Sequence, residues 1–373
     1  MFRFSLLVVG LCSCNKQIQI AGDFQPVGTE AYDSGEHHTE AVNNLDAPDD
    51  DADDDDADMD GAVDDGSDDG GTDDGGDDGD GDNGDGDDGD GDDGGGDAGS
   101  DTTDTSPSDA ALLNLDASGP YGQTTSTGTF SSSDGCDMDY QRHTPTERTH
   151  DGEAFIFHGF MRGKEQFFDL AEHLASWGIT ATAVDFCHST FSDVDTEQNS
   201  RDGVEFARSL GASNVVWMGQ SNGGLSALIA GGLATDISAG VLGLDPVESM
   251  AGGGETWAGL VTSPAAALFG IADSCNSDNS GLAIYRAVAD TRSARVNESD
   301  HCSFEFPSNF LCTAVCDRPK STFSDAEVRY TILELTTAWT LGRLEPGFDD
   351  GPWWDVTGER YEEFSAIGAL SPL

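Results

Sequence analysis

Residues 214–233 read NVVWMGQSNGGLSALIAGGL. An apolar, partly β-branched run is followed by Gly219-x-Ser221-x-Gly223, and then by small and apolar residues over the length of a helix. Between a strand and a helix, G-x-S-x-G is typical of a nucleophile elbow, a tight turn that presents a serine hydroxyl at the carboxyl end of the strand. The glycines allow the two flanking backbones to approach closely. The stretch therefore predicts that Ser221 is a catalytic nucleophile at the edge of a sheet.

The segments on either side of this stretch alternate in the same manner. From Glu153 onward, short apolar runs alternate with runs whose apolar residues have helical spacing. Continuous apolar strands separated by helices are typical of a parallel sheet covered on both faces. We therefore predict an α/β fold, with a mostly parallel sheet flanked by helices. The expected strands are 154–157, 179–186, 214–218, 239–244, 265–271 and 293–296, and the expected helices are 167–176, 202–210, 225–233 and 325–341.

A serine nucleophile needs a general base, and the order of residues along the chain favours His301. This histidine follows the last expected core strand, so it should lie at the same edge of the sheet as the serine. His188 also follows a strand and is the competing candidate. His158 follows the first core strand, where we expect a histidine to support the loop.

Two carboxylates are candidates to orient the imidazole of the base. Asp245 ends the strand 239–244, and Asp273 follows the strand 265–271. Both should emerge at the edge that carries the serine. Spacing alone favours Asp273, because the strand nearer the histidine is the usual carrier of the acid.

An oxyanion formed during acyl transfer needs two backbone amide donors. The amide of Asn222, directly after the nucleophile, is the first candidate. The amide of Phe160, in the loop after the first core strand, is the second, and Gly159 keeps that loop clear of the substrate carbonyl. We also expect Phe160 and Met161 to line the acyl side of a substrate pocket.

Four motifs carry a family resemblance: His158-Gly159-Phe160, His173-Leu174-Ala175-Ser176-Trp177-Gly178, Gly219-Gln220-Ser221-Asn222-Gly223-Gly224 and Leu244-Asp245-Pro246-Val247. Together they resemble the α/β-hydrolase fold, and within it the chlorophyllase-type hydrolases, with polyester- and cutin-cleaving enzymes as more distant relatives. The resemblance spans roughly residues 152–316. In the chlorophyllase pattern the acid is the Asp of the Asp-Pro-Val stretch, so the resemblance implies Asp245. Gln220 and Asn222 replace the His and Arg of that pattern. The resemblance therefore implies the hydrolytic machinery, but it does not imply that chlorophyll is the substrate.

The charge of the chain is concentrated in one tract. The 373 residues include 72 Asp+Glu and 16 Lys+Arg, a formal net charge of −56, and residues 46–104 hold 29 Asp without a Glu, Lys or Arg. Such a tract cannot bury apolar area and repels itself, so we expect residues 46–110 to be a long disordered acidic linker. Its D-G-D-x-D-G repeats lack the Glu that ends an EF-hand loop. Without a basic face, the chain is not expected to bind nucleic acid.

The N-terminus has the pattern of a targeting segment. Residues 1–14 combine one positive charge, a short apolar run and small residues, as in a signal peptide. Leu11-Cys12-Ser13-Cys14 resembles the lipobox of bacterial lipoproteins, with Cys14 as the expected lipidation site and Cys12 as a poorer fit. We expect an exported lipoprotein at the bacterial outer membrane or cell surface, with secretion as the alternative. A polar segment, 15–45, would then precede the linker, and a hydrolase domain, 111–373, would follow it.

Six further cysteines lie after the acidic tract. An even number in an exported chain favours disulfide bonds, and no set of four ligands has the spacing of a zinc site. The pairs that we expect are Cys275–Cys302, Cys312–Cys316 and Cys136–Cys187.

The sequence therefore predicts an exported serine esterase that acts through Ser221, His301 and an aspartate. No metal or organic cofactor is implied, and the expected partner is a small-molecule or polymeric ester bound by a monomer. Two other functions stay open. One is an acyltransferase that uses an alcohol in place of water, and the other is a catalytically silent surface binding protein on a hydrolase scaffold.

Overall fold

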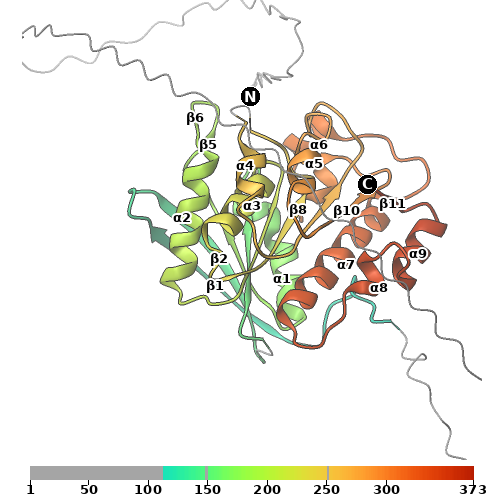
Figure 1. Cartoon of the computed structure of the whole chain (residues 1–373), viewed down its shortest axis with the longest axis horizontal. Helices are drawn as coiled ribbons and strands as arrows, with labels where there is room; N and C mark the ends of the chain where they lie inside the picture. Colours follow the sequence, from blue (N-terminus) through green and yellow to red (C-terminus); the bar gives the residue numbers. More distant parts are fainter. Residues whose placement is uncertain (1–111, 148–149, 250–251) are drawn as a thin grey trace, which may run out of the picture. The chain divides into compact units, whose positions relative to one another are not determined.

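A mixed sheet lies at the centre of the part of the chain that the computed structural model describes, residues 112–147, 150–249 and 252–373 (Figure 1). The six central strands are parallel to one another, and the strands that flank them at both edges pair antiparallel. The prediction of an α/β fold with a mostly parallel sheet flanked by helices is confirmed. In spatial order the strands are β1 (Gln123–Ser131), β2 (Asp137–Pro145), β4 (Thr180–Val184), β3 (Glu153–Phe157), β7 (Val215–Gln220), β8 (Ser238–Leu244), β9 (Ala265–Phe269), β10 (Thr291–Val296) and β11 (Leu370–Pro372).

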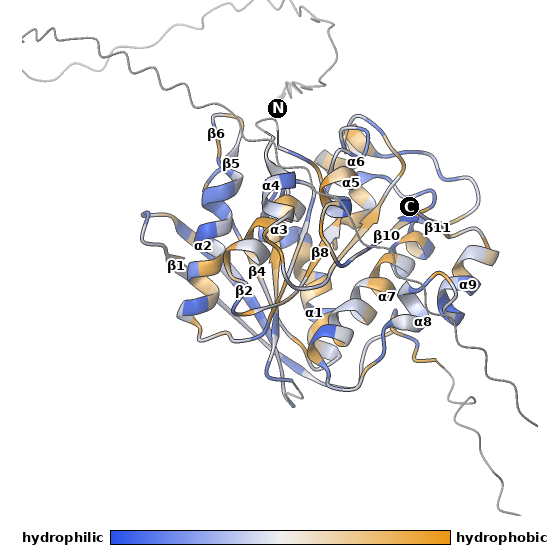
Figure 2. Ribbon diagram, viewed as in Figure 1, coloured by the Kyte–Doolittle hydropathy of each residue, from blue (hydrophilic) through white to orange (hydrophobic). Residues whose placement is uncertain are grey.

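The central strands are buried on both faces of the sheet. Every residue of β3, β4, β7 and β9 is buried. Because successive side chains of a strand point to opposite faces, Phe155 and Phe157 of β3 pack on one side, and Ala154 and Ile156 on the other. Double burial explains why these strands are continuous apolar runs, and in Figure 2 the central strands of the sheet are mainly coloured as hydrophobic.

Two groups of helices cover the two faces. Apolar residues of α2, α3, α4 and α5 join the cluster that contains Phe155 and Phe157, whereas those of α1, α7, α8 and α9 join the cluster that contains Ala154 and Ile156. The first group is α2 (Thr196–Ser209), α3 (Asn222–Leu233), α4 (Gly254–Ala258) and α5 (Gly281–Arg286); the second is α1 (Phe168–Ser176), α7 (Asp325–Leu344), α8 (Gly351–Trp354) and α9 (Glu359–Ala366).

Capping residues explain where two helices begin. The helix expected over 202–210 is α2, which starts earlier, at Thr196, because the side chain of Asp195 accepts a hydrogen bond from the Gln198 amide at 2.9 Å. Helix α7 starts as expected after a capping box formed by Ser324 and Glu327.

The antiparallel edges were not expected from the sequence. Strand β1 has the sequence QTTSTGTFS, which is polar and largely exposed, and it forms a hairpin with β2. Strand β11 pairs with β10 at the opposite edge. These strands flank the parallel part and carry none of the predicted site residues.

Short elements gather near the carboxyl ends of the parallel strands, at the top of Figure 1. Because neighbouring parallel strands end at the same edge, the loops after β3, β7, β8, β9 and β10 meet there. The short elements are η2 (Lys164–Phe167), the hairpin of β5 (Ser189–Thr190) and β6 (Asp193–Val194), η3 (His301–Phe304) and α6 (Phe310–Cys316).

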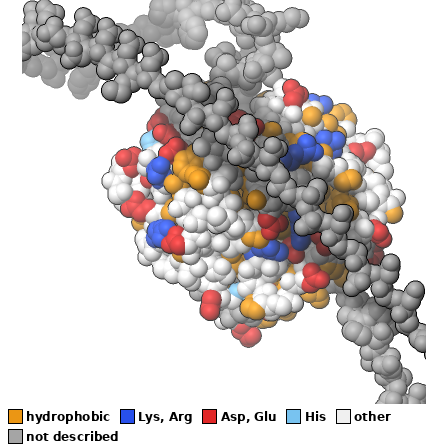
Figure 3. Space-filling model, in the orientation of Figure 1, with side chains coloured by type: hydrophobic (Ala, Val, Ile, Leu, Met, Phe, Trp, Pro, Cys, Tyr) orange, Lys and Arg blue, Asp and Glu red, His pale blue; other side chains and the backbone are white. Residues whose placement is uncertain are grey.

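The predicted signal peptide 1–14 with Cys14, the segment 15–45 and the linker 46–110 lie outside the described residues. In the described part of the chain, no helix combines the length and the apolar character that a membrane span needs. Acidic and basic side chains are interspersed with uncharged ones on the face visible in Figure 3.

Candidate active site

Ser221 lies in a strained turn between β7 and α3. Its backbone has φ 58° and ψ −126°, a conformation that non-glycine residues rarely adopt and that often marks functional sites. A side chain at Gly219 would collide with the carbonyl of Gly223, and one at Gly223 would collide with the carbonyl of Phe157. The glycines of the motif are therefore required because β7, α3 and the end of β3 are in close backbone contact. The turn leaves Ser221 9% exposed.

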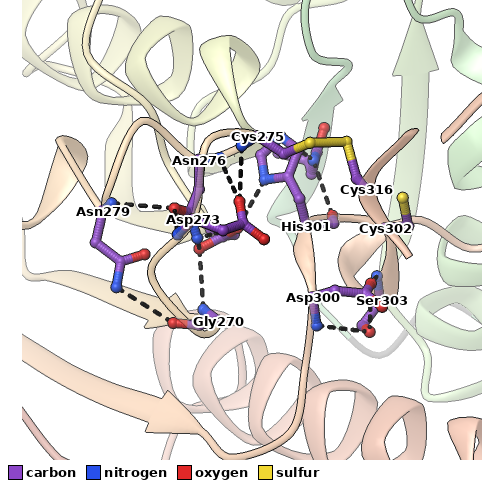
Figure 4. A network of polar contacts seen from close by, with 12 residues as sticks. Gly270, Asp273, Cys275, Asn276, Asn279, Asp300, His301, Cys302, Ser303 and Cys316 are labelled. Atoms are coloured by element: carbon purple, nitrogen blue, oxygen red, sulfur yellow. Dashed lines mark hydrogen bonds and ion pairs between the residues drawn. A yellow bond between two sulfur atoms is a disulfide. The ribbon is translucent and has the colours of Figure 1, made fainter. Parts of the chain in front are cut away.

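Asp245 and His301 form a buried pair. Nδ1 of His301 lies 2.6 Å from Oδ2 of Asp245, and the two residues are 8% and 0% exposed. The Gly270 amide donates to Oδ1 of Asp245 at 2.9 Å, and Nδ2 of Asn276 lies 3.3 and 3.2 Å from its two oxygens. Gly270, Asn276 and His301 are labelled in Figure 4. The carboxylate is thus fully hydrogen-bonded, and it fixes the His301 tautomer that carries a proton on Nδ1.

Asp273 has different partners. Its carboxylate accepts hydrogen bonds from the amides of Cys275 and Asn276, and pairs with Nε of Arg318 at 2.7 Å. It therefore shapes the loop that holds Asn276 against Asp245. Of the two acid candidates, the structure brings Asp245 to His301.

The second ring nitrogen of His301 contacts Gln220. Nε2 of His301 lies 3.0 Å from Nε2 of Gln220, and the same amide nitrogen lies 3.2 Å from the main-chain oxygen of His301. Among the described residues, His301 makes no hydrogen bond to Oγ of Ser221. Sequence reasoning missed Gln220 and Asn276, although the position of Gln220 next to Ser221 in the turn was the available signal.

The predicted oxyanion donors lie on the two sides of Ser221. Asn222 is the first residue of α3, and Phe160 follows the loop residue Gly159, where a side chain would come within 2.9 Å of the Cβ of Ser221. Within the described structure, the amides of Asn222 and Phe160 donate no hydrogen bond. Two unpaired amides near a serine provide the donors that an oxyanion hole needs.

The competing candidate His188 and the loop histidine His158 both have structural partners. His158 is 2% exposed, donates from Nδ1 to the oxygen of Gly159 and accepts the Phe186 amide at Nε2, and burial lowers its pKa. It holds the loop that carries Phe160, as expected. His188 lies 2.9 Å from Asp193 in the β5–β6 region and makes no contact with Ser221 among the described residues.

The residues expected to line the substrate pocket are part of a partly exposed apolar group that includes Phe191. The ring of Phe160 packs edge-to-face against Phe191, with centroids 4.9 Å apart, and Met161 is 42% exposed. The amide of Met161 donates a hydrogen bond to the oxygen of Ser189, which ties the predicted oxyanion loop (residues 158–163) to the β5–β6 hairpin.

A buried ion pair joins the oxyanion loop to the loop after His301. Nε of Arg162 lies 2.7 Å from Oε1 of Glu305, without the alignment of a hydrogen bond, and Glu305 is fully buried. Burial raises the pKa of Glu305, and the Arg162 charge opposes that rise. Because Arg162 follows Phe160 by two residues and Glu305 follows His301 by four, the pair connects the two halves of the site.

Three disulfides brace this edge. Cys136–Cys187 forms as expected, but the predicted pairs Cys275–Cys302 and Cys312–Cys316 are wrong, because the actual pairs are Cys275–Cys316 and Cys302–Cys312. Cys312 and Cys316 are one turn apart on α6, which keeps their Cβ atoms farther apart than a disulfide allows. The sulfurs of Cys302, Cys312 and Cys316 lie within 4.8 Å of one another, but all three are consumed in disulfides and offer no thiolate to a metal.

No protein-family model matches the chain, and a search of curated proteins found no match. The chemistry of the site is therefore inferred from its geometry. A serine in a strained turn, a carboxylate–imidazole pair and two unpaired amides are the groups that acyl transfer through a covalent intermediate requires. These groups need no metal to act in that way.

Proposed function

We propose that the chain is a serine hydrolase of the α/β-hydrolase fold that cleaves carboxylic esters. The observation that carries this proposal is the 2.6 Å contact between His301 and Asp245 at the sheet edge where the strained turn presents Ser221. Three strand ends contribute the three side chains, in the chain order serine, acid, histidine that this fold uses. Esters are favoured over peptides by the resemblance to chlorophyllase-type hydrolases.

In the proposed mechanism, the hydroxyl oxygen of Ser221 attacks the ester carbonyl. Nε2 of His301 takes the serine proton and then donates it to the leaving alcohol as the C–O bond breaks. Asp245 keeps the ring oriented and stabilises the imidazolium, and the amides of Phe160 and Asn222 stabilise the oxyanion. Water, activated by the same histidine, then hydrolyses the acyl-enzyme.

The experiment that tests this proposal is covalent labelling. A fluorophosphonate probe should label the wild-type protein and should not label Ser221→Ala, and hydrolysis of p-nitrophenyl esters of graded acyl length should be lost in the same variant. Folded wild-type protein that neither reacts with the probe nor hydrolyses any ester of the series would indicate a silent binding protein. Ester products formed with added acceptor alcohols would indicate an acyltransferase.

We further propose export with a lipid anchor at Cys14. The disulfides support an oxidising compartment, in which such bonds persist. Incorporation of labelled palmitate in a bacterial host, lost in Cys14→Ser but retained in Cys12→Ser, is the expected result. Unlabelled protein in the culture medium would favour plain secretion instead.

A further inference from the structure

The side-chain amide of Gln220 lies against the nitrogen of His301 that the proposed mechanism requires. Gln220 is the last residue of β7 and is 1% exposed. Its Nε2 is 3.0 Å from the ring Nε2 of His301 and 3.2 Å from the main-chain oxygen of the same residue. With Asp245 on Nδ1, both ring nitrogens of His301 are occupied.

The surroundings determine which end of the amide faces the histidine. The main-chain oxygen of His301 can only accept a hydrogen bond, so the facing group is the NH2 group, which has two protons to donate. One proton is donated to that oxygen and the other to the ring Nε2. The amide oxygen of Gln220 lies near Gly159, where a Cβ atom would come within 2.6 Å of it. An NH2 donor can bind Nε2 only when this nitrogen carries no proton, so the contact selects the neutral ring.

Resting on the proposed function, we propose that Gln220 is a positioning residue that holds the imidazole of His301 neutral and oriented until Ser221 transfers its proton. Nε2 has a single lone pair, so the amide must release it as Ser221 donates its proton, and the resulting imidazolium can no longer accept from the amide. The contact therefore exists in the resting enzyme and is lost in the imidazolium state.

Three carboxylates near the ring of His301 act on its protonation together with Gln220. Asp245, at the end of β8, favours the imidazolium. Glu305, which follows η3, acts in the same direction but is paired with Arg162 of the oxyanion loop. Asp300, directly before His301, is paired with Lys320. Gln220 is the uncharged contact that favours the neutral ring, and it opposes these carboxylates.

The test replaces Gln220 in the full chain and follows the base in two ways. Gln220→Met keeps the length of the side chain and removes the donor. The acid limb of the pH profile of kcat/KM for a soluble p-nitrophenyl ester should move to higher pH by about 0.5–1 unit, the value of one hydrogen bond. The protonation midpoint of His301, measured from its ring nitrogens by NMR, should move by the same amount. Gln220→Glu should move both farther in the same direction, because a carboxylate at Nε2 pairs with the imidazolium.

A matched control lies on β2. Nε2 of Gln141 is 2.9 Å from Nε2 of His143, which is the same kind of contact away from the site. Gln141→Met should leave the profile and the His301 midpoint unchanged. A folded Gln220→Met in which the acid limb and the His301 midpoint stay constant, or move to lower pH, overturns the inference. If Gln220→Met does not fold, the same two results in Gln220→Glu overturn it. An inactive wild type whose His301 midpoint moves as expected would remove the proposed function but support the role of Gln220.

Discussion

At the scale of single residues, the two candidate acids differ in their partners rather than in their burial. Asp245 is 0% exposed and Asp273 is 4% exposed. Asp245 faces His301 and Asn276, whereas Asp273 faces Arg318 and the amides of its own loop. A carboxylate on an imidazole nitrogen is the arrangement that orients a catalytic base. The two residues therefore provide a matched comparison.

We predict that Asp245→Asn lowers kcat about 10⁴-fold, because the neutral amide no longer fixes the His301 tautomer. Asp273→Asn should lower it far less, since its effect reaches the site only through the loop that holds Asn276. Steady-state kinetics on the two variants, with circular dichroism to establish folding, makes the comparison. Equal losses in both would contradict the assignment of the acid.

The Arg162–Glu305 pair gives a second prediction at this scale. Glu305→Gln leaves a largely buried guanidinium without its carboxylate, so the free energy of unfolding should fall by about 3–5 kcal/mol. The double variant Arg162→Met, Glu305→Gln should recover part of that loss, because no uncompensated charge remains. Urea unfolding of the two single variants and the double variant measures the coupling. Losses that simply add would show that the pair does not act as a unit.

Sequence reasoning identified the residues that lie at element boundaries, and missed those defined by contacts. Ser221 and His301 were placed by a motif and by chain order. Spacing alone favoured Asp273, because it contains no information about which strand end faces the histidine. Gln220 and Asn276 act through hydrogen bonds between segments 81 and 31 residues apart, which a single sequence does not reveal.

At the scale of elements, we expect the individual disulfides to affect stability and activity to different degrees. In the loop-closure model, removing Cys136–Cys187, which closes 51 residues, should cost about 4 kcal/mol, and removing Cys302–Cys312, which closes 10, about 3 kcal/mol. The loss of activity should follow the opposite order and be larger without Cys302–Cys312, because Cys302 is directly after His301. Paired Cys→Ser variants, compared by urea unfolding and by kcat/KM, should give these reversed rankings. The same ranking in both measurements would indicate that the bond near the base has no local role.

The loop before η3 gives a prediction about acid. Hydrogen bonds from the hydroxyl of Ser321 and from the amides of Phe323 and Thr322 lower the pKa of Glu298. A group with a lowered folded pKa stabilises the fold above its unfolded value and loses this contribution as the pH falls through the folded value. The amides of Thr322 and Phe323 should therefore begin to lose protection from hydrogen exchange below about pH 4, the unfolded value for Glu, and lose it fully only below the lowered folded value.

Glu298→Gln provides the control for this prediction, since it cannot titrate. Protection of the two amides should then be lower near neutral pH and should change little as the pH falls. An unchanged pH dependence in the variant would show that another group controls the loop.

The parallel strands were predictable because double burial produces continuous apolar runs, as in β3 and β7. Strand β1 was missed because its QTTSTGTFS sequence is polar on both faces. Helix α6, FLCTAVC, is too short for its periodicity to be recognised, and this omission produced the two wrong disulfides. Its register, not the spacing of the cysteines, decides which pairs can form.

At the scale of the whole molecule, charge is the dominant feature. Residues 105–373 alone contain 38 acidic and 14 basic residues, a net charge of −24. Repulsion of this kind destabilises a compact state and is screened by salt. We predict that the Tm of the full chain rises between 0.05 M and 1 M sodium chloride, measured by calorimetry. A fall in Tm would mean that the ion pairs at the surface contribute more than the excess of negative charge.

Two of the three sulfur bridges converge on α6, and this arrangement bears on how the protein must be produced. Six thiols allow many isomers, and any isomer that joins Cys302 or Cys316 to another partner would shift the segment that carries the imidazole. We therefore expect correct pairing of these cysteines to require oxidising conditions during folding. In a preparation from a reducing cytosol we expect polypeptide of the right mass in which the segment around His301 lacks these two bonds.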